Sequence, residues 1–208
     1  MPPSADELRA VLLVEGLSDA AAVEVLARRR GIDLLASAVV VQAMGGATNI
    51  AAHLEHFGPH GIDVRLGGLY DMGEERFFVR GLERAGLVVS ATPGDLAGLG
   101  FFACDPDLEH ELIRALGPDR CVEVIRDAGD GAAWDLFQRQ PYQRERPAEL
   151  QVHRWLASGS GRKIRYAAAF TEALDLDHVP RSLHRLLDHA LERAPYRGDD
   201  VPIDRGGS

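Results

Sequence analysis

The feature that most constrains the fold is a regular alternation of short apolar runs with longer amphipathic segments. The runs fit buried strands, and the segments between them repeat apolar residues with helical spacing. Strands that alternate with helices at this spacing form an open parallel sheet with right-handed crossovers. We therefore predict an α/β, Rossmann-like fold with strands at 11–14, 37–44, 64–71, 87–91 and 100–104 and helices at 19–30, from about 48, at 73–86 and at 105–117.

The second half of the chain has a different character. The run 121–125 fits one more strand, and beyond it helical patterns dominate. The last residues are polar and rich in Gly, Pro and Asp, which is typical of disorder. We predict helices at 130–139, 147–157, 161–174 and 180–192, and we divide the chain into an α/β domain (8–126), a helical extension packed on it (127–193) and a disordered tail (194–208).

Two helix starts carry recognisable capping residues. Ser18 is expected to cap the helix 19–30 through its hydroxyl group. Asp105 is expected to cap the helix 105–117, with Pro106 in its first turn and Gly117 as its stop.

Composition limits the class of protein. The chain has 208 residues, of which 46% are hydrophobic, and no apolar run approaches the length of a membrane span. No secretion signal is visible, and the two cysteines, Cys104 and Cys121, form no CxxC pair, so we expect a cytoplasmic protein. A net charge of −9 argues against a protein that passively coats nucleic acid. It does not exclude an enzyme that acts on nucleic acid, because acids that hold divalent cations present positive charge once the ions are bound.

Carboxylates follow three of the predicted strands. Glu15 comes directly after the run 11–14, and Asp71 ends the run 64–71. An acidic cluster of Asp105, Asp107 and Glu109 follows the run 100–104. The carboxyl ends of parallel strands meet at one edge of a sheet, so these groups are expected to lie together. Oxygen ligands in an open cluster suit Mg²⁺ or Mn²⁺, and such ions serve phosphoryl chemistry. Taken singly, each acid also fits an ordinary helix start or turn.

The lone lysine is the other unusual feature. Of the 23 basic residues, 22 are arginine and one is Lys163. A chain that fills its basic positions with arginine keeps a lysine either by chance or where a compact ammonium group is needed.

These segments carry a resemblance to a known family. VLLVEGLSDAAAVEVLA (11–27) resembles the first motif of the TOPRIM domain, and GLYDMGEE (68–75) lies where the Asp-x-Asp motif of that domain belongs. FFACDPDLEHELIRALG (101–117) and GSGRKIRYAAAFTEAL (159–174) resemble the acidic third motif and the lysine helix of the overcoming-lysogenization-defect (OLD) nucleases. The resemblance implies a TOPRIM-like fold over about residues 10–190.

The resemblance also implies roles for residues. Glu15 and Asp71 would bind one divalent ion, and Asp19 with Asp107 and Glu109 would bind or support a second. Lys163 would stabilise charge on the scissile phosphate. Together these roles imply a nuclease that cleaves DNA or RNA by two-metal hydrolysis with Mg²⁺ or Mn²⁺, with DNA as the favoured substrate. Glu15, Asp71 and Lys163 would then be the catalytic residues.

The chain departs from the family in two respects. The second aspartate of Asp-x-Asp is replaced by Gly73, so Glu74 is the candidate substitute, unless it is only a first-turn acid of the next helix. OLD nucleases commonly carry an ATPase domain, but this sequence has no GxxxxGK[ST] motif, so an ATPase would have to come from another chain.

Other interpretations remain open at this point. With Gly73 in the motif, the domain could instead be a degenerate TOPRIM module that binds nucleic acid or an ATPase without cleavage. A receiver-like phosphoacceptor is disfavoured, because only one acid ends the first strand and Lys163 lies too far along the chain. A histidine run at 53, 56 and 60 is a weak metal candidate, because Gly58 and Pro59 interrupt its helix.

The only clearly basic stretch spans residues 139–165. It holds seven basic residues against two acids, which suits electrostatic binding of a nucleic-acid backbone. The sequence leaves a homodimer open and predicts no membrane contact.

Overall fold

The computed structural model describes residues 7–87 and 95–192. Its centre is a parallel sheet of four described strands in the order β2-β1-β3-β4. Residues pair in register across it, so that Leu12 faces Val41 on one side and Gly67 on the other, and Asp71 faces Cys104. The strands are β1 (Ala10–Val14), β2 (Val39–Ala43), β3 (Arg65–Asp71) and β4 (Phe101–Cys104).

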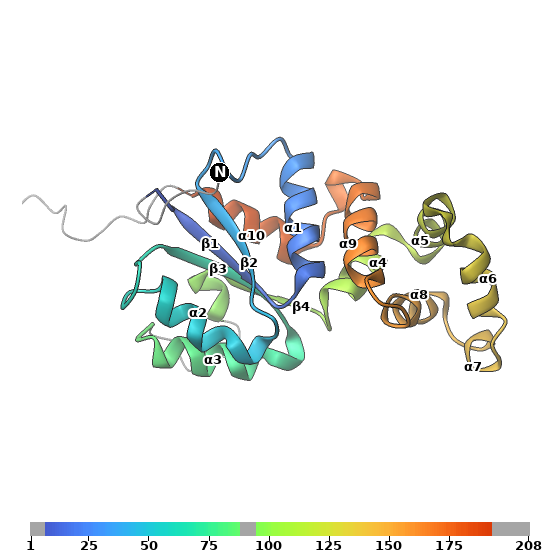
Figure 1. Cartoon of the computed structure of the whole chain (residues 1–208), viewed down its shortest axis with the longest axis horizontal. Coiled ribbons are helices and arrows are strands. Elements are labelled where there is room, and N and C mark those ends of the chain that lie inside the picture. The colour runs from blue at the N-terminus through green and yellow to red at the C-terminus, as the bar shows by residue number, and fades with distance from the viewer. Residues whose placement is uncertain (1–6, 88–94, 193–208) are drawn as a thin grey trace, which may run out of the picture.

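Helices cover both faces of this sheet (Figure 1). Side chains alternate along each strand, so β1 sends Leu12 and Val14 into one hydrophobic core and Val11 and Leu13 into the other. One face is covered by α2 (Ile50–Phe57) and α3 (Glu75–Arg84), and the opposite face by α1 (Leu17–Arg29) and α10 (Arg181–Leu191).

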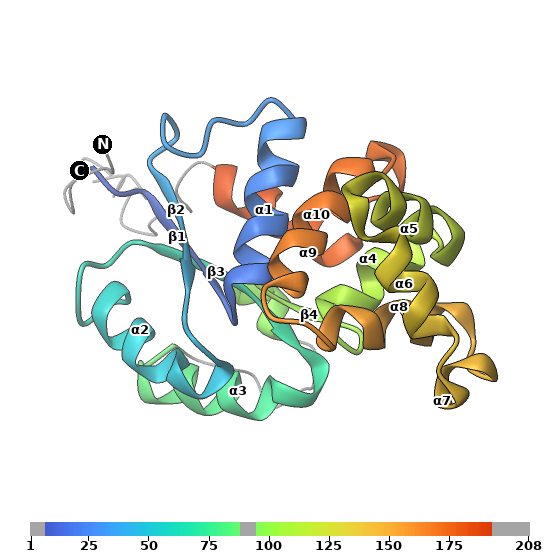
Figure 2. The same cartoon turned by 45° about the vertical axis from the view of Figure 1, so that its right-hand side comes forward.

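The remaining helices are grouped beyond one side of the sheet in both views (Figures 1 and 2). α9 packs on α1 and α4, and the buried rings of Trp134 and Trp155 meet edge to face between α6 and α8. The helices are α4 (Leu108–Leu116), α5 (Pro118–Ile125), α6 (Gly131–Gln138), α7 (Pro141–Arg144), α8 (Ala148–Ala157) and α9 (Arg162–Ala173).

Short helical turns complete the described chain. A π-helical turn joins α5 to α6, and Gly129 within it has a positive φ of 88°. The turns are η1 (Ala47–Asn49), η2 (Met72–Glu74), η3 (Asp95–Leu99), η4 (Arg126–Asp130) and η5 (Leu176–His178). Within the two described ranges, no helix is both long and apolar enough to cross a membrane.

The predicted fold class is confirmed: a parallel sheet lies between helices, with more helices after it. The prediction of a strand at 121–125 is wrong, because this segment belongs to α5. Pro118 occupies the first turn, and Cys121, Val124 and Ile125 are buried at helical spacing. The predicted strand 87–91 falls almost wholly on residues 88–94, outside the described residues.

Both predicted caps are wrong. Gly16 occupies the N-cap position of α1, where its backbone N–H donates to Asp19 at 2.8 Å. α4 begins at Leu108, after Asp107, whose carboxylate accepts the backbone N–H of His110 at 2.8 Å. An N-cap side chain must reach a backbone N–H two or three residues later, and here Asp107 takes that position in place of Asp105.

Candidate metal centre

Glu15 and Asp71 lie at the point where the strand order reverses. The chain leaves β1 toward β2 and later returns on the other side of β1 as β3. The two adjacent carboxyl ends therefore open a crevice, which is where parallel sheets bind ligands. The backbone N–H of Asp71 donates to Glu15 Oε1 at 2.9 Å, which fixes the Glu15 carboxylate beside β3.

Asp19 joins them from the first turn of α1. Its Oδ2 accepts the Gly16 N–H, so the capping bond also holds the carboxylate at this edge. Burial, then the charges of Glu109 and Glu15, raise the pKa of Asp19 to about 7. A capping carboxylate that is exposed to water keeps a pKa near its ordinary value. The raised pKa of Asp19 therefore reflects its burial beside other acids and not its role as a cap.

Asp71 is partly buried among four other carboxylates. Burial raises its pKa to about 8, and the charges of Glu15, Asp107, Asp19 and Glu109 raise it further, in that order. Burial also raises the pKa of Glu15 above its ordinary value. Carboxylates at the end of β1, in α1, at the end of β3 and at the start of α4 thus lie at the one edge of the sheet that the sequence predicted.

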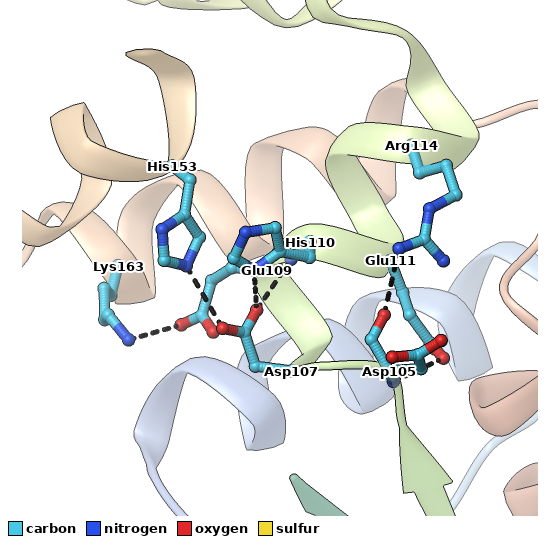
Figure 3. A network of polar contacts seen from close by, with 8 residues as sticks. All are labelled: Asp105, Asp107, Glu109, His110, Glu111, Arg114, His153 and Lys163. Carbon is cyan, nitrogen blue, oxygen red and sulfur yellow. Dashed lines mark hydrogen bonds and ion pairs between the residues drawn. The ribbon is translucent and has the colours of Figure 1, made fainter. Parts of the chain in front are cut away.

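Glu109 and Lys163 meet across two helices (Figure 3). Glu109 lies in the first turn of α4 and is only 5% exposed, and its Oε1 is 3.2 Å from Lys163 Nζ on α9. Burial would lower the pKa of Lys163, but Glu109, Asp107 and Asp71 raise it above its ordinary value. The lone lysine therefore carries a full positive charge at the rim of the carboxylates, with its side chain 49% exposed.

Glu74 lies in η2, directly after β3. Among the neighbouring charges that raise the pKa of Glu15, Glu74 acts most strongly, ahead of Glu109. A Cβ atom added at Gly73 would meet nothing within 4 Å, so this position has open space for a side chain.

Two histidines that the sequence did not single out complete the centre (Figure 3). His110 Nδ1 lies 2.8 Å from Asp107 Oδ1, and His153 Nε2 of α8 lies 3.2 Å from Asp107 Oδ2. Burial would raise the pKa of Asp107, but the hydrogen bonds from His153 and from the backbone and ring of His110 hold it well below its ordinary value.

Only one of these histidines leaves a signal in the sequence. His110 follows Asp107 by three residues, the spacing that places two side chains on one helical face. His153 comes from a helix distant in the sequence, and only the packing of α8 on α4 brings it close. Within the described ranges, the only group of three or more metal-ligating side chains of His, Cys, Asp or Glu within 4.8 Å is Asp107, His110 and His153, so the run at 53, 56 and 60 forms no such group.

Comparison with known proteins finds a likeness to one family. The sequence profile of the family described as overcoming lysogenization defect protein-like, TOPRIM domain, matches residues 8–66, which include β1, Glu15 and Asp19. Residues 8–66 are therefore similar to the OLD-like TOPRIM domain. No curated protein matches the chain.

The TOPRIM fold continues well beyond the matched segment. The C-terminal region of the Burkholderia pseudomallei OLD protein has a TM-score of 0.66 and 21% identity, over 88% of this chain and 97% of that one. The C-terminal region of the Xanthomonas campestris pv. campestris OLD protein, in crystals phased with mercury, gives a TM-score of 0.66 and 23% identity, over 88% and 95%. At these identities the likeness concerns the fold, and it includes the helices after the TOPRIM sheet.

Proposed function

We propose that this TOPRIM domain hydrolyses phosphodiester bonds of a nucleic acid with the help of bound Mg²⁺ or Mn²⁺. The observation that supports the proposal is the convergence of Glu15, Asp19 and Asp71 at one crevice, with raised pKa values. Buried carboxylates that repel one another are stabilised either by protons or by a cation. At neutral pH a divalent ion would replace the protons that burial and repulsion otherwise retain.

The donor set fits hard divalent ions. Glu15 and Asp71 would hold one ion, and Asp19, Asp107 and Glu109 would hold or support a second. Glu74 would assist at the first position, since Gly73 supplies no carboxylate. Such ions, when bound, supply Lewis acidity and a water nucleophile for displacement at phosphorus.

Backbone N–H groups hold the carboxylates of the site in position. The Asp71 N–H keeps Glu15 turned toward β3, and the Gly16 N–H keeps Asp19 at the crevice. The half-exposed Lys163 ammonium would leave Glu109 for a phosphate oxygen and stabilise the negative charge that develops there.

The arginines in the segment from α6 to α8 would bind the phosphates of the nucleic-acid backbone. Arg144 and Arg146 donate to the backbone carbonyls of Arg139 and Tyr142, at 3.1 and 2.9 Å. No carboxylate of the described chain pairs with either guanidinium group, so both charges remain available to phosphates. DNA is the first substrate to test, and an ATPase supplied in trans is the protein partner that the family resemblance favours.

The decisive experiment is cleavage of supercoiled plasmid and of single-stranded DNA and RNA with Mg²⁺ or Mn²⁺. Wild type should nick or cut at least one substrate, and chelator should stop the reaction. Glu15→Gln should be inactive, because it removes a charged ligand while keeping an acceptor for the Asp71 N–H. Glu24→Gln is the matched control, since Glu24 is an exposed acid on α1. Equal activity of wild type and Glu15→Gln would refute the proposal.

A second candidate function is binding of nucleic acid or of an ATPase without cleavage. The observation in its favour is Gly73, which leaves the Asp-x-Asp position without its second carboxylate. This alternative predicts metal binding by calorimetry and DNA binding by anisotropy, but no product from any substrate with either ion.

A further inference from the structure

We propose that Asp107, His110 and His153 form a mixed nitrogen–oxygen site for a divalent transition metal of the Zn²⁺, Co²⁺ or Mn²⁺ type. The inference deepens the proposed function and rests on it in one respect, since Asp107 is also a ligand in the carboxylate centre. It assigns the imidazoles as ligands, which the sequence motifs do not.

The geometry brings one ligand atom from each residue within 4.8 Å of the other two. The imidazoles approach Asp107 from different helices, His110 from α4 and His153 from α8 (Figure 3). His110 contacts Oδ1 of the carboxylate, and His153 contacts Oδ2. The two rings lie with their centroids 3.7 Å apart at an interplanar angle of 31°. Both nitrogens therefore converge on one carboxylate.

Helix capping does not account for this arrangement. As the N-cap of α4, Asp107 needs only one oxygen, which accepts the backbone N–H of His110. The second oxygen, Oδ2, instead contacts the ring of His153 on α8. All three side chains are mostly buried here. Their exposed fractions are 20% for Asp107, 15% for His110 and 24% for His153.

The chemistry of the donors selects the class of metal. Imidazole nitrogen is a good ligand for Zn²⁺ and Co²⁺ and a weaker one for Mn²⁺, whereas Mg²⁺ prefers oxygen throughout. Metal binding would replace the hydrogen bonds between the imidazole nitrogens and the carboxylate with metal–ligand bonds. The site would thus supply nitrogen ligands next to Glu109, in a domain that lacks the second Asp-x-Asp carboxylate.

Cobalt binding to the purified chain, with no nucleic acid present, tests this site. Titration with Co²⁺ should give visible absorption bands of a nitrogen-containing site, and His153→Gln and His110→Gln should each weaken the binding that gives them. Removal of a residue that only hydrogen-bonds to a metal ligand usually lowers metal affinity by about 10- to 100-fold. Each histidine variant should therefore lose at least that much Co²⁺ affinity. His184→Gln is the matched control, because His184 also lies beside a carboxylate, 2.9 Å from Asp188, but on an exposed helix face.

An independent readout uses wild type alone, so the result does not depend on whether a variant folds. Pulsed electron paramagnetic resonance of the Mn²⁺-loaded protein should show coupling to ¹⁴N nuclei, which oxygen ligands cannot produce. The absence of nitrogen coupling, together with unchanged Co²⁺ affinity in both histidine variants, would overturn the proposal. Failure of plasmid cleavage would refute only the nuclease, because neither measurement here requires turnover.

Discussion

At the scale of single residues, the carboxyl groups of the metal centre couple stability to pH. The pKa is about 7 for Asp19 and about 8 for Asp71 in the folded protein, whereas aspartate in an unfolded chain has a pKa near 4. The folded state therefore binds more protons between about pH 4 and pH 8. Their contribution to the free energy of unfolding is complete below about pH 4 and is lost as pH rises through 7 and 8.

We predict that the metal-free protein melts at a lower temperature at pH 9 than at pH 5.5. Asp71→Asn should flatten this fall, because the amide has no proton to lose, and Mg²⁺ or Mn²⁺ should restore the melting temperature mainly at high pH. Each kcal/mol corresponds to roughly 2–4 °C for a chain of this size. Thermal unfolding in chelator across this pH range provides the measurement, and equal pH slopes for wild type and Asp71→Asn would contradict the prediction.

Lys163 gives a second prediction at this scale. Lys163→Met should lower the single-turnover cleavage rate by about 10²–10³-fold, the usual effect of losing one donor to a developing negative charge. Lys163→Arg should also lose activity if the compact ammonium group matters. DNA affinity should change little, and Arg165→Lys on the same helix should cleave normally. Wild-type rates in Lys163→Met would remove the lysine from the mechanism.

Gly73 offers a gain-of-function test. An added Cβ meets no atom within 4 Å, so Gly73→Asp should fold as wild type and supply the missing carboxylate. We expect tighter Mg²⁺ binding, on the order of tenfold, because a further charged oxygen ligand suits this hard ion. Gly73→Asn, measured by calorimetry beside it, keeps the size but not the charge. Equal Mg²⁺ affinity in the two variants would show that position 73 does not face an ion.

At the scale of elements, the close contact of β1, β3 and β4 sets the position of the acids. Gly68 in β3 has no room for a side chain: an added Cβ would lie 2.5 Å from the carbonyl oxygen of Leu13 and 2.9 Å from Phe101 Cδ1. The strand ends that carry Glu15 and Asp71 depend on this close approach of the backbones.

Gly68→Ala should therefore destabilise the protein by about 1–3 kcal/mol or more, the usual range for overpacking in a core. It should also weaken metal binding, because the adjacent strands must separate only a few residues before their acids. Gly98→Ala is the matched control, since its Cβ would meet nothing within 4 Å. Urea unfolding with calorimetry of each variant is the measurement, and equal stability of the two would contradict the argument.

At the scale of the whole molecule, the last described helix belongs to the core of the sheet. α10 buries Leu183, Leu186 and Leu187, and it packs on β3 and β4. Its His189 Nε2 is 2.9 Å from the carbonyl oxygen of Leu66. The boundary at residue 126, proposed from the sequence, thus divides segments that share one hydrophobic cluster.

We predict that a chain ending at residue 126 does not unfold cooperatively, because the part of the sheet that α10 covers would lie open to water. A chain ending at residue 192 keeps every described core residue and should melt as wild type. Circular dichroism melts and binding of a hydrophobic dye distinguish the two. A sharp melting transition of the shorter chain would establish 8–126 as an independent domain.

The sequence alone determined the fold class and the edge at which the acids gather. Runs such as 11–14 and 64–71 are long enough for strands, and the helices between them impose parallel crossovers. Once the strands are parallel, Glu15 and Asp71 must share an edge, whatever the details of packing. This information is local, which is why periodicity and position were sufficient.

Only the tertiary structure decided the other features. The segment 121–125 is apolar enough for a strand, but burial on one side of α5 makes it a helix. Asp107, not Asp105, caps α4, and His153 reaches Asp107 from a helix whose first residue is 40 positions after the first residue of α4. These outcomes depend on contacts between residues far apart in the sequence. Short-range sequence patterns contain no information about such contacts. The contacts form only when the whole chain packs, because the burial of apolar surface stabilises them.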